Sequence, residues 1–123
     1  MPDARRAVPW YSDAVSNPGS LVVLSTFPDA DTAARVARTL VEEQLAACVN
    51  LLPMVRSIYR WEGKVCDEAE TLALIKTTAE RYAALAAKIA ELHPYQVPEV
   101  IALPLADGNP PYLAWLAAQV AQP

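Results

Sequence analysis

Cys48 is a residue of the sequence that could do chemistry, because its sulfur can bind a metal ion or react. It lies in the segment LAACVN, residues 45–50, where helical spacing gives way to β-forming residues. As a ligand, its thiolate would favour a soft or reduced ion such as Cu(I). A cysteine among small residues can also pack as a small hydrophobic side chain at a helix-to-strand junction. The pattern leaves both interpretations open.

His93 is the only histidine in the chain and the best donor it offers to Cu(II). It follows a helical pattern and precedes Pro94, so it sits where the helix dipole favours a cation. A structural role at the helix end therefore competes with a role as a ligand. One histidine does not make a strong metal site, and a site built on it would need carboxylates, for example from another subunit.

Hydrophobic periodicity predicts the elements that must position these residues. Short apolar runs predict strands, and an apolar residue at every third or fourth position predicts a helix. The predicted order is strand, helix, strand, strand, helix, strand and a short helix, over residues 21–27, 28–45, 48–61, 65–77, 78–92, 97–105 and 112–120. This order predicts an α+β fold, the ferredoxin-like βαββαβ sandwich with a long β-hairpin and a short C-terminal helix.

Both main helices of such a fold cover one face of the sheet. Residues such as Leu24, Val55 and Leu74 would lie on the other, bare face, which favours an oligomer over a monomer. Two local signals support the helix starts. Asp29 suits the start of the first helix, and Thr77 with Glu80 has capping-box spacing at the second.

The hairpin over residues 49–76 allows a test of the cysteines. If Glu62 and Gly63 form its tip, counting back along both strands puts Cys66 opposite Tyr59 and Cys48 opposite Thr77. The two cysteines would then be roughly 36 Å apart, at ~3.3 Å per residue. A disulfide needs Cα atoms within about 7 Å. The count therefore excludes an intrachain disulfide unless the hairpin is broken or bends back at Pro53.

Counting residues along the second helix and the hairpin also predicts that Cys48 and His93 lie far apart within one chain. The second helix starts beside Cys48 and runs away from it, so His93 should lie near the level of Glu70. Residues 56–69 would project past the helices, and a free two-stranded ribbon needs neighbours to hold it. Pro53 should bend the first hairpin strand or place it at the edge of the sheet.

The first 20 residues lack sustained periodicity. We expect residues 1–20 to form a loosely ordered arm, pinned by Trp10 and Tyr11, before a domain over residues 21–123. They contain no apolar core of a secretory signal, so we expect a cytoplasmic protein. No apolar run approaches the ~20 residues of a membrane span.

Charge and cysteine content restrict the partners further. The formal net charge is −4, which weighs against binding to nucleic acid, because phosphate contacts need a basic face. Two cysteines are too few for a disulfide framework. We therefore expect no nucleic acid and no membrane among the partners.

Five stretches of the sequence resemble the CutA divalent-cation tolerance family. They follow in the family's order over residues 21–120, and read TFPDADTAARVARTLVEEQLAACVNLLP, SIYRWEGKV, ETLALIKTT, ELHPYQVPEVIALP and YLAWL. Three features depart from the family: Met54 stands where Gly is frequent, Cys66 stands where an acidic residue is common, and residues 1–20 lie outside the match.

The resemblance implies a ferredoxin-like protomer in a tight homotrimer, with the hairpin packing across neighbouring subunits. It also implies a fold relationship to the PII signalling proteins, tolerance of copper and other divalent cations, and binding of Cu(II). Animal relatives are linked to the anchoring of acetylcholinesterase. No established enzymatic activity comes with the family, and no tightly bound organic cofactor is implied.

The family motifs also single out candidate site residues. Those that could bind metal are His93, Cys48, Glu70 and Glu99. Those expected in a ligand or interface groove between subunits are Lys76, Tyr95, Tyr59, Trp61 and Trp115. For the aromatic residues the alternative is packing at an interface, and for Lys76 it is an ion pair with a carboxylate.

Two classes of function follow. The leading prediction is a non-enzymatic trimer that binds divalent copper weakly in intersubunit grooves. The alternative is a PII-like signalling or adaptor trimer that binds a small anion or nucleotide between subunits, with an unknown protein partner. An enzyme ranks third, because the sequence has no Ser/His/Asp set, no Gly-rich phosphate loop and no C-x-x-C pair.

Overall fold

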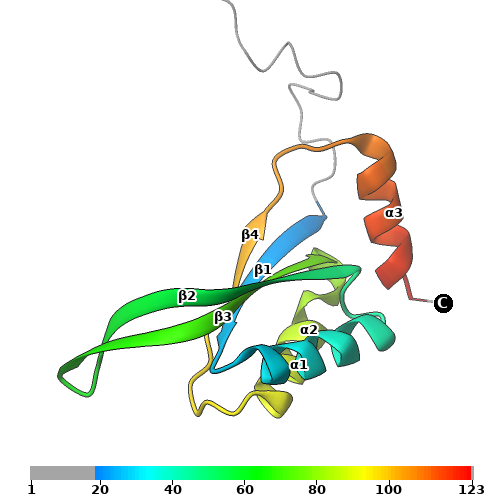
Figure 1. Ribbon diagram of the computed structural model, residues 1–123. Coiled ribbons are helices and arrows are strands. Elements are labelled where there is room, and N and C mark those ends of the chain that lie inside the picture. The colour runs from blue at the N-terminus through cyan, green and yellow to red at the C-terminus, as the bar shows by residue number, and fades with distance from the viewer. Residues whose placement is uncertain (1–18, 123) are drawn as a thin grey trace, which may run out of the picture.

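A computed structural model describes residues 19–122, which form a four-stranded antiparallel sheet with helices packed on it (Figure 1). The strands are β1 (Ser20–Phe27), β2 (Cys48–Trp61), β3 (Lys64–Thr78) and β4 (Ile101–Pro104), in the spatial order β2-β3-β1-β4. The helices are α1 (Ala30–Glu42), α2 (Ala79–Leu92) and α3 (Pro110–Val120). The order of elements and the sheet order confirm the predicted ferredoxin-like α+β fold.

The core lies between the sheet and the helices α1 and α2. Val36 and Leu40 of α1 and Leu85 of α2 are buried against sheet residues such as Val23 and Ile75. The third helix, α3, packs apart from this core at the end of the sheet where β1 begins, with Leu116 and Val120 buried beside Ala47 (Figure 1). The last strand is shorter than predicted, because residues 97–100 run as an irregular segment before β4.

Of the two helix starts, one is as predicted. The Asp29 carboxylate accepts a hydrogen bond of 2.7 Å from the backbone N–H of Thr32, which caps α1. The prediction of a capping box formed by Thr77 and Glu80 is wrong, since the N-cap of α2 is Thr78 and its side chain makes no capping hydrogen bond. Thr77 is instead buried at the end of β3, where its hydroxyl donates to the Leu45 carbonyl at 2.7 Å.

The hairpin of β2 and β3 keeps the predicted register near its tip and departs from it further down. Tyr59 pairs with Cys66 as counted, but Cys48 pairs with Lys76 rather than Thr77. A bulge between Leu52 and Val55 adds one residue to β2 and causes this shift. Both cysteines are free.

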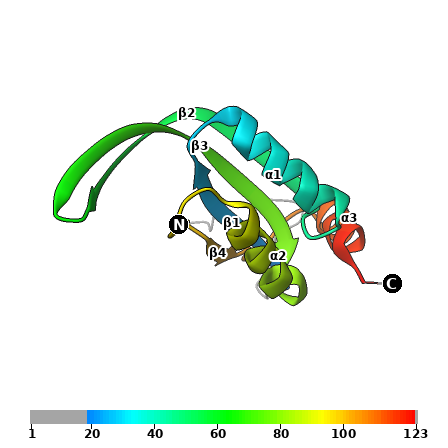
Figure 2. The ribbon, with the colours of Figure 1, turned by 90° about the horizontal axis from the view of Figure 1, so that it is seen from below.

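Pro53 and Met54 are the residues of this bulge, and Met54 has a positive φ of 64°. The bulge lies in β2, which is an edge strand, as expected from Pro53. Beyond the bulge the hairpin curves and projects well past the helices (Figure 2).

The sheet face turned away from α1 and α2 is apolar. Strand register places Leu24, Leu74, Ile101 and Leu103 on this bare face, since paired residues of antiparallel strands share a face. Ile101 and Leu103 are each 51% exposed. Val55 also lies there, because it pairs with Glu70. As predicted, α1 and α2 both pack on the opposite face of the sheet.

The predicted N-terminal arm falls almost wholly outside the described residues. Residues 1–18, with Trp10 and Tyr11, are not described, and β1 already starts at Ser20. The arm therefore stays a prediction. In the described part of the chain, no helix combines the length and apolar character needed to cross a membrane.

Candidate functional site

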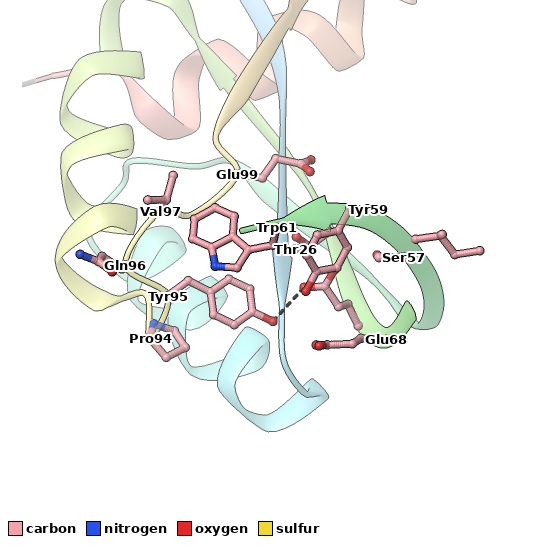
Figure 3. A pocket seen from close by; sticks show the side chains of 12 residues that line it. Thr26, Ser57, Tyr59, Trp61, Glu68, Pro94, Tyr95, Gln96, Val97 and Glu99 are labelled. Carbon is pink, nitrogen blue, oxygen red and sulfur yellow. Dashed lines mark hydrogen bonds between the residues drawn. The ribbon is translucent and has the colours of Figure 1, made fainter. Parts of the chain in front are cut away.

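An open groove of about 800 Å³ lies between the projecting hairpin and the loop that follows α2 (Figure 3). Because side chains alternate along a strand, Ser57, Tyr59 and Trp61 of β2 lie on the same face of the hairpin as Glu68 and Glu70 of β3, and this face borders the groove. The residues that line it are Thr26 of β1, Ser57, Ile58, Tyr59, Trp61, Glu68 and Glu70 of the hairpin, and Pro94, Tyr95, Gln96, Val97 and Glu99 of the loop.

Glu70 and Tyr95 join the two sides of the groove. The Tyr95 hydroxyl donates a hydrogen bond of 2.8 Å to Oε2 of Glu70. Glu70 is buried, with only 8% of its surface exposed. Burial and the neighbouring Glu70 carboxylate raise the pKa of Tyr95 well above its usual value. Tyr95 therefore stays protonated at neutral pH and acts as the donor in this contact.

His93 lies directly behind the groove and fixes the loop. Its Nε2 contacts the Thr26 carbonyl at 2.7 Å, and its Nδ1 accepts from the Tyr95 N–H at 3.1 Å. These partners assign the neutral tautomer that carries the proton on Nε2. The ring also stacks on Phe27, with centroids 4.5 Å apart. Both ring nitrogens are therefore used within the chain, and a metal ion at His93 would have to displace one of these contacts.

The groove is acidic. Glu68, Glu70 and Glu99 line it, and among residues 19–122 no Lys, Arg or His belongs to the lining. Burial, followed by the charge of Glu68, raises the pKa of Tyr59. The groove thus places three carboxylates beside the rings of Tyr59, Trp61 and Tyr95.

These carboxylates are the groups that could hold a hard or borderline cation. They do not converge on one point within a single chain. Among the residues at 19–122, no three His, Cys, Asp or Glu side chains are grouped so that they could hold a metal ion. A complete coordination shell would therefore need water molecules or a second chain.

Cys48 and Lys76 form a separate cluster on the bare face of the sheet. Nζ of Lys76 lies 3.9 Å from Sγ of Cys48 and hydrogen-bonds the side chain of Asn50. Lys76 is six residues along β3 from Glu70, which corresponds to about 20 Å. Within one chain, Cys48 therefore cannot share a ligand with Glu70. Lys76 contacts an amide and a thiol rather than the carboxylate considered from the sequence.

Trp115 lies neither in the groove nor in the cluster of Cys48 and Lys76. It lies on α3, is 43% exposed and packs beside Tyr112, with ring centroids 5.5 Å apart. Of the predicted groove residues, the structure brings together Tyr59, Trp61 and Tyr95, and leaves Lys76 and Trp115 outside. Glu70 and Glu99, predicted as metal ligands, are in the same groove.

Glu68 and the loop residues Gln96 and Val97 were missed. Glu68 could have been found, because it lies two residues from Glu70 on the same strand and must share its face. Gln96 and Val97 could not, because residues 93–100 form no periodic element whose faces a pattern could predict.

Comparisons with known proteins agree on one family. The family model of the CutA1 divalent ion tolerance protein matches residues 21–119. A divalent-cation tolerance protein CutA of Thermus thermophilus is 52% identical over 95 residues, which cover 77% of this chain and 92% of that protein. Mouse protein CutA is 48% identical over 100 residues, covering 80% of this chain and 56% of the longer mouse protein.

A solved structure matches as well. The periplasmic divalent cation tolerance protein CutA of Archaeoglobus fulgidus superimposes with a TM-score of 0.80 at 32% sequence identity. The match covers 83% of this chain and 99% of that one. The fold and the sequence therefore point to the same relatives.

Proposed function

The chain belongs to the CutA1 divalent ion tolerance family, and from this premise we propose that it is a non-enzymatic homotrimer that binds Cu(II) weakly in its acidic groove. The observation that carries the proposal is the lining of the groove, which contains Glu68, Glu70 and Glu99 and, in the described part of the chain, no cationic side chain. A divalent cation would relieve the repulsion among these carboxylates. Binding of this kind supports cation tolerance without a chemical step.

The donor types support weak rather than tight binding. Carboxylate oxygens bind Cu(II) less strongly than imidazole or thiolate, although Cu(II) is favoured over other divalent ions at a given site. His93 is the stronger donor, but its nitrogens bind Thr26 and Tyr95. Cys48 is remote from the groove. We therefore place the ion at the carboxylates and keep His93 as the residue that positions Tyr95.

Exposed apolar side chains and unpaired sheet edges of the single chain support the proposed trimer. The apolar bare face exposes Ile101 and Leu103, and the projecting hairpin exposes Ile58 (64%) and Val65 (67%). Exposed apolar patches of this kind mark association sites in soluble proteins. Strands β2 and β4 are the two edges of the sheet and can pair with other chains. A neighbour at either edge could also complete the coordination of a bound ion.

The PII-like alternative, a trimer that binds a small anion or nucleotide, gains no support from the groove. Its three carboxylates would repel an anion, and the lining residues include no cation to offset them. Lys76, the cation suggested from the sequence, lies outside the groove and bonds to Asn50.

The cytoplasmic location is proposed from the sequence alone. The Archaeoglobus relative is described as periplasmic, so location can differ within the family. Fractionation of the host cell, with the protein detected by antibody, tests this part of the proposal. Recovery from the periplasm or the medium would contradict it.

Titration with Cu(II) in a non-coordinating buffer, followed by calorimetry, tests the metal site. We expect Glu70→Gln together with Glu99→Gln to weaken binding about tenfold, while Cys48→Ser leaves it unchanged. Glu42→Gln, which removes an exposed carboxylate on α1, is the matched control. If instead Cys48→Ser abolishes binding and the groove variants do not weaken it, the site is at the thiol and the proposed location is wrong.

Native mass spectrometry tests the trimer. We expect the mass of three chains for the wild type, and a shift toward one chain for Ile101→Lys with Leu103→Lys. Both lysines would introduce charge on the exposed bare face rather than in the core. A monomer in the wild-type sample would contradict this part of the proposal.

A further inference from the structure

We propose that Asp107 and Gly108 form a site of spontaneous covalent modification, at which Asp107 converts to isoaspartate through a cyclic succinimide. The site lies in the loop of residues 105–109, which joins β4 to α3 (Figure 1). The N–H of Leu105 donates to the carbonyl of Ser20, at the opposite end of β1 from the groove residue Thr26. The inference therefore goes beyond the proposed metal function and uses none of its carboxylates.

The sequence singles out Asp107 for this reaction. It is the only aspartate or asparagine of the chain that precedes a glycine. A succinimide forms when the backbone nitrogen of the next residue attacks the side-chain carboxyl carbon. A Cβ on that next residue hinders the attack, and glycine has none. The reaction is therefore slower at Asp29, Asp31 and Asp67, which precede alanine, threonine and glutamate.

The structure holds the two reacting groups side by side. The Gly108 N–H donates a hydrogen bond of 2.8 Å to Oδ1 of Asp107. Since a C=O bond measures about 1.2 Å, the Gly108 nitrogen lies within about 4 Å of the Cγ atom that it must attack. The side chain of Asp107 is thus already turned toward the attacking nitrogen.

The backbone around this pair is not held by regular secondary structure. Residues 105–109 belong to no helix or strand, and the Gly108 N–H is used in the bond to Asp107. By contrast, Asp31 lies in α1 and Asp67 lies in β3. Ring closure within a helix or a sheet needs local unfolding first, whereas a loop can rearrange more easily. Geometry and local structure therefore favour the same aspartate as the sequence.

The reaction needs no co-reactant except water. A bond forms between the Gly108 nitrogen and Cγ of Asp107, the Cγ–OH bond breaks, and the hydroxyl leaves with the amide proton as water. Water then opens the ring. Attack at Cγ restores aspartate, whereas attack at the backbone carbonyl carbon leaves the chain linked through Cγ, with the same mass and one more backbone atom. The carboxyl reacts as the neutral acid, so ring closure is faster at lower pH.

The additional backbone atom would weaken the attachment of α3. A Cβ added at Gly108 would lie 3.1 Å from the side chain of Leu113, so the loop packs closely on this residue of α3. Leu113 is itself buried. A backbone that is longer by one C–C bond of about 1.5 Å cannot keep this contact and still enter α3 at Pro110 unchanged. We therefore expect isoaspartate at position 107 to loosen α3.

Incubation of the full chain at physiological temperature tests the site. The readout is mass spectrometry after digestion with an endoproteinase that cuts before aspartate but not before isoaspartate. We expect the cut before Asp107 to be lost at least about tenfold faster than the cuts before Asp29, Asp31 and Asp67 in the same sample. The loss should be faster at about pH 5 than at about pH 8. Equal rates at the four positions would overturn the proposal.

Two variants check the chemistry. Asp107→Glu keeps the carboxylate but would need a six-membered ring, and Gly108→Ala adds the hindering Cβ. We expect at least about tenfold less rearranged product from each, as measured by electron-transfer fragmentation of the peptide. Because the added Cβ would crowd Leu113, Asp107→Glu alone carries the test if Gly108→Ala changes the fold. Wild-type rates in Asp107→Glu would overturn the mechanism.

Hydrogen exchange tests the consequence for α3. We expect the backbone amides of α3 to exchange faster in incubated than in fresh wild-type protein, because its attachment is looser. Equally incubated Asp107→Glu is the matched control and should keep the exchange rates of its fresh sample. Isoaspartate at position 107 with unchanged exchange in α3 would overturn the proposed link between the modification and this helix.

Discussion

The hydroxyl of Tyr95 donates to Oε2 of Glu70 at 2.8 Å, and this contact fastens the loop after α2 to the hairpin. His93 supports it from behind, because its ring accepts from the Tyr95 N–H and contacts the Thr26 carbonyl. One chain of hydrogen bonds thus runs from β1 through His93 and Tyr95 to Glu70. It sets the shape of the acidic groove.

Tyr95→Phe should reduce the free energy of unfolding by about 1–3 kcal/mol. The change keeps the ring but removes the hydroxyl, so the buried Glu70 carboxylate loses its donor. Urea denaturation at pH 7 measures the effect. Tyr112→Phe is the control, since Tyr112 is exposed on α3, and it should change the free energy by less than about 0.5 kcal/mol. Equal effects of the two changes would contradict a special role for Tyr95.

The stability of the wild type should fall at high pH because of Tyr95. Its pKa is raised in the folded state, so the folded protein holds this proton more tightly than the unfolded chain. The resulting stabilisation is fully present below the unfolded pKa of about 10 and is lost as the pH rises through the folded pKa. Urea denaturation at several pH values between about 8 and 11 should give a steeper loss for the wild type than for Tyr95→Phe. Parallel profiles would rule out this linkage.

His93→Leu should destabilise the protein by about 2 kcal/mol. Leucine fills part of the buried space but makes neither of the two hydrogen bonds of the ring. Because His93 and Tyr95 act in one network, the double variant with Tyr95→Phe should lose less than the sum of the two single changes. Urea denaturation of all four proteins measures this coupling. Strict additivity would show that His93 does not position Tyr95.

Met54→Gly should stabilise the protein by about 0.5 kcal/mol. Met54 has a φ of 64°, a left-handed conformation that costs a side chain about 1–2 kcal/mol and costs glycine nothing. Because glycine also raises the conformational entropy of the unfolded chain, part of this gain in stability is lost. The side chain is 81% exposed, so little packing is lost.

Thermal denaturation of Met54→Gly and Met54→Ala separates the backbone effect from the side chain. Alanine has the same left-handed cost as methionine and should leave the stability nearly unchanged. A gain with alanine as large as that with glycine would show that the methionine side chain, not the backbone, carries the strain.

The sequence by itself determined the fold and part of the groove. Short apolar runs and helically spaced apolar residues predicted the order of strands and helices. The turn at EGK, residues 62–64, predicted the pairing of Tyr59 with Cys66. Counting along α2 placed His93 near the level of Glu70, and the Tyr95 bond between loop and hairpin confirms that level. These features follow from the local periodicity, which can be read from the sequence. Together with the constant rise per residue of helices and strands, the number of residues then gives their relative positions.

The tertiary structure alone decided how those residues are used. The bulge at Pro53 and Met54 shifts Cys48 from Thr77 to Lys76, and no periodic pattern reports one extra residue in an edge strand. The tertiary structure also gives both ring nitrogens of His93 partners within the chain, one from β1 and one from a loop without periodicity. Contacts between segments far apart in the chain depend on how helices and strands pack, and this packing is what places the carboxylates of the groove beside its rings.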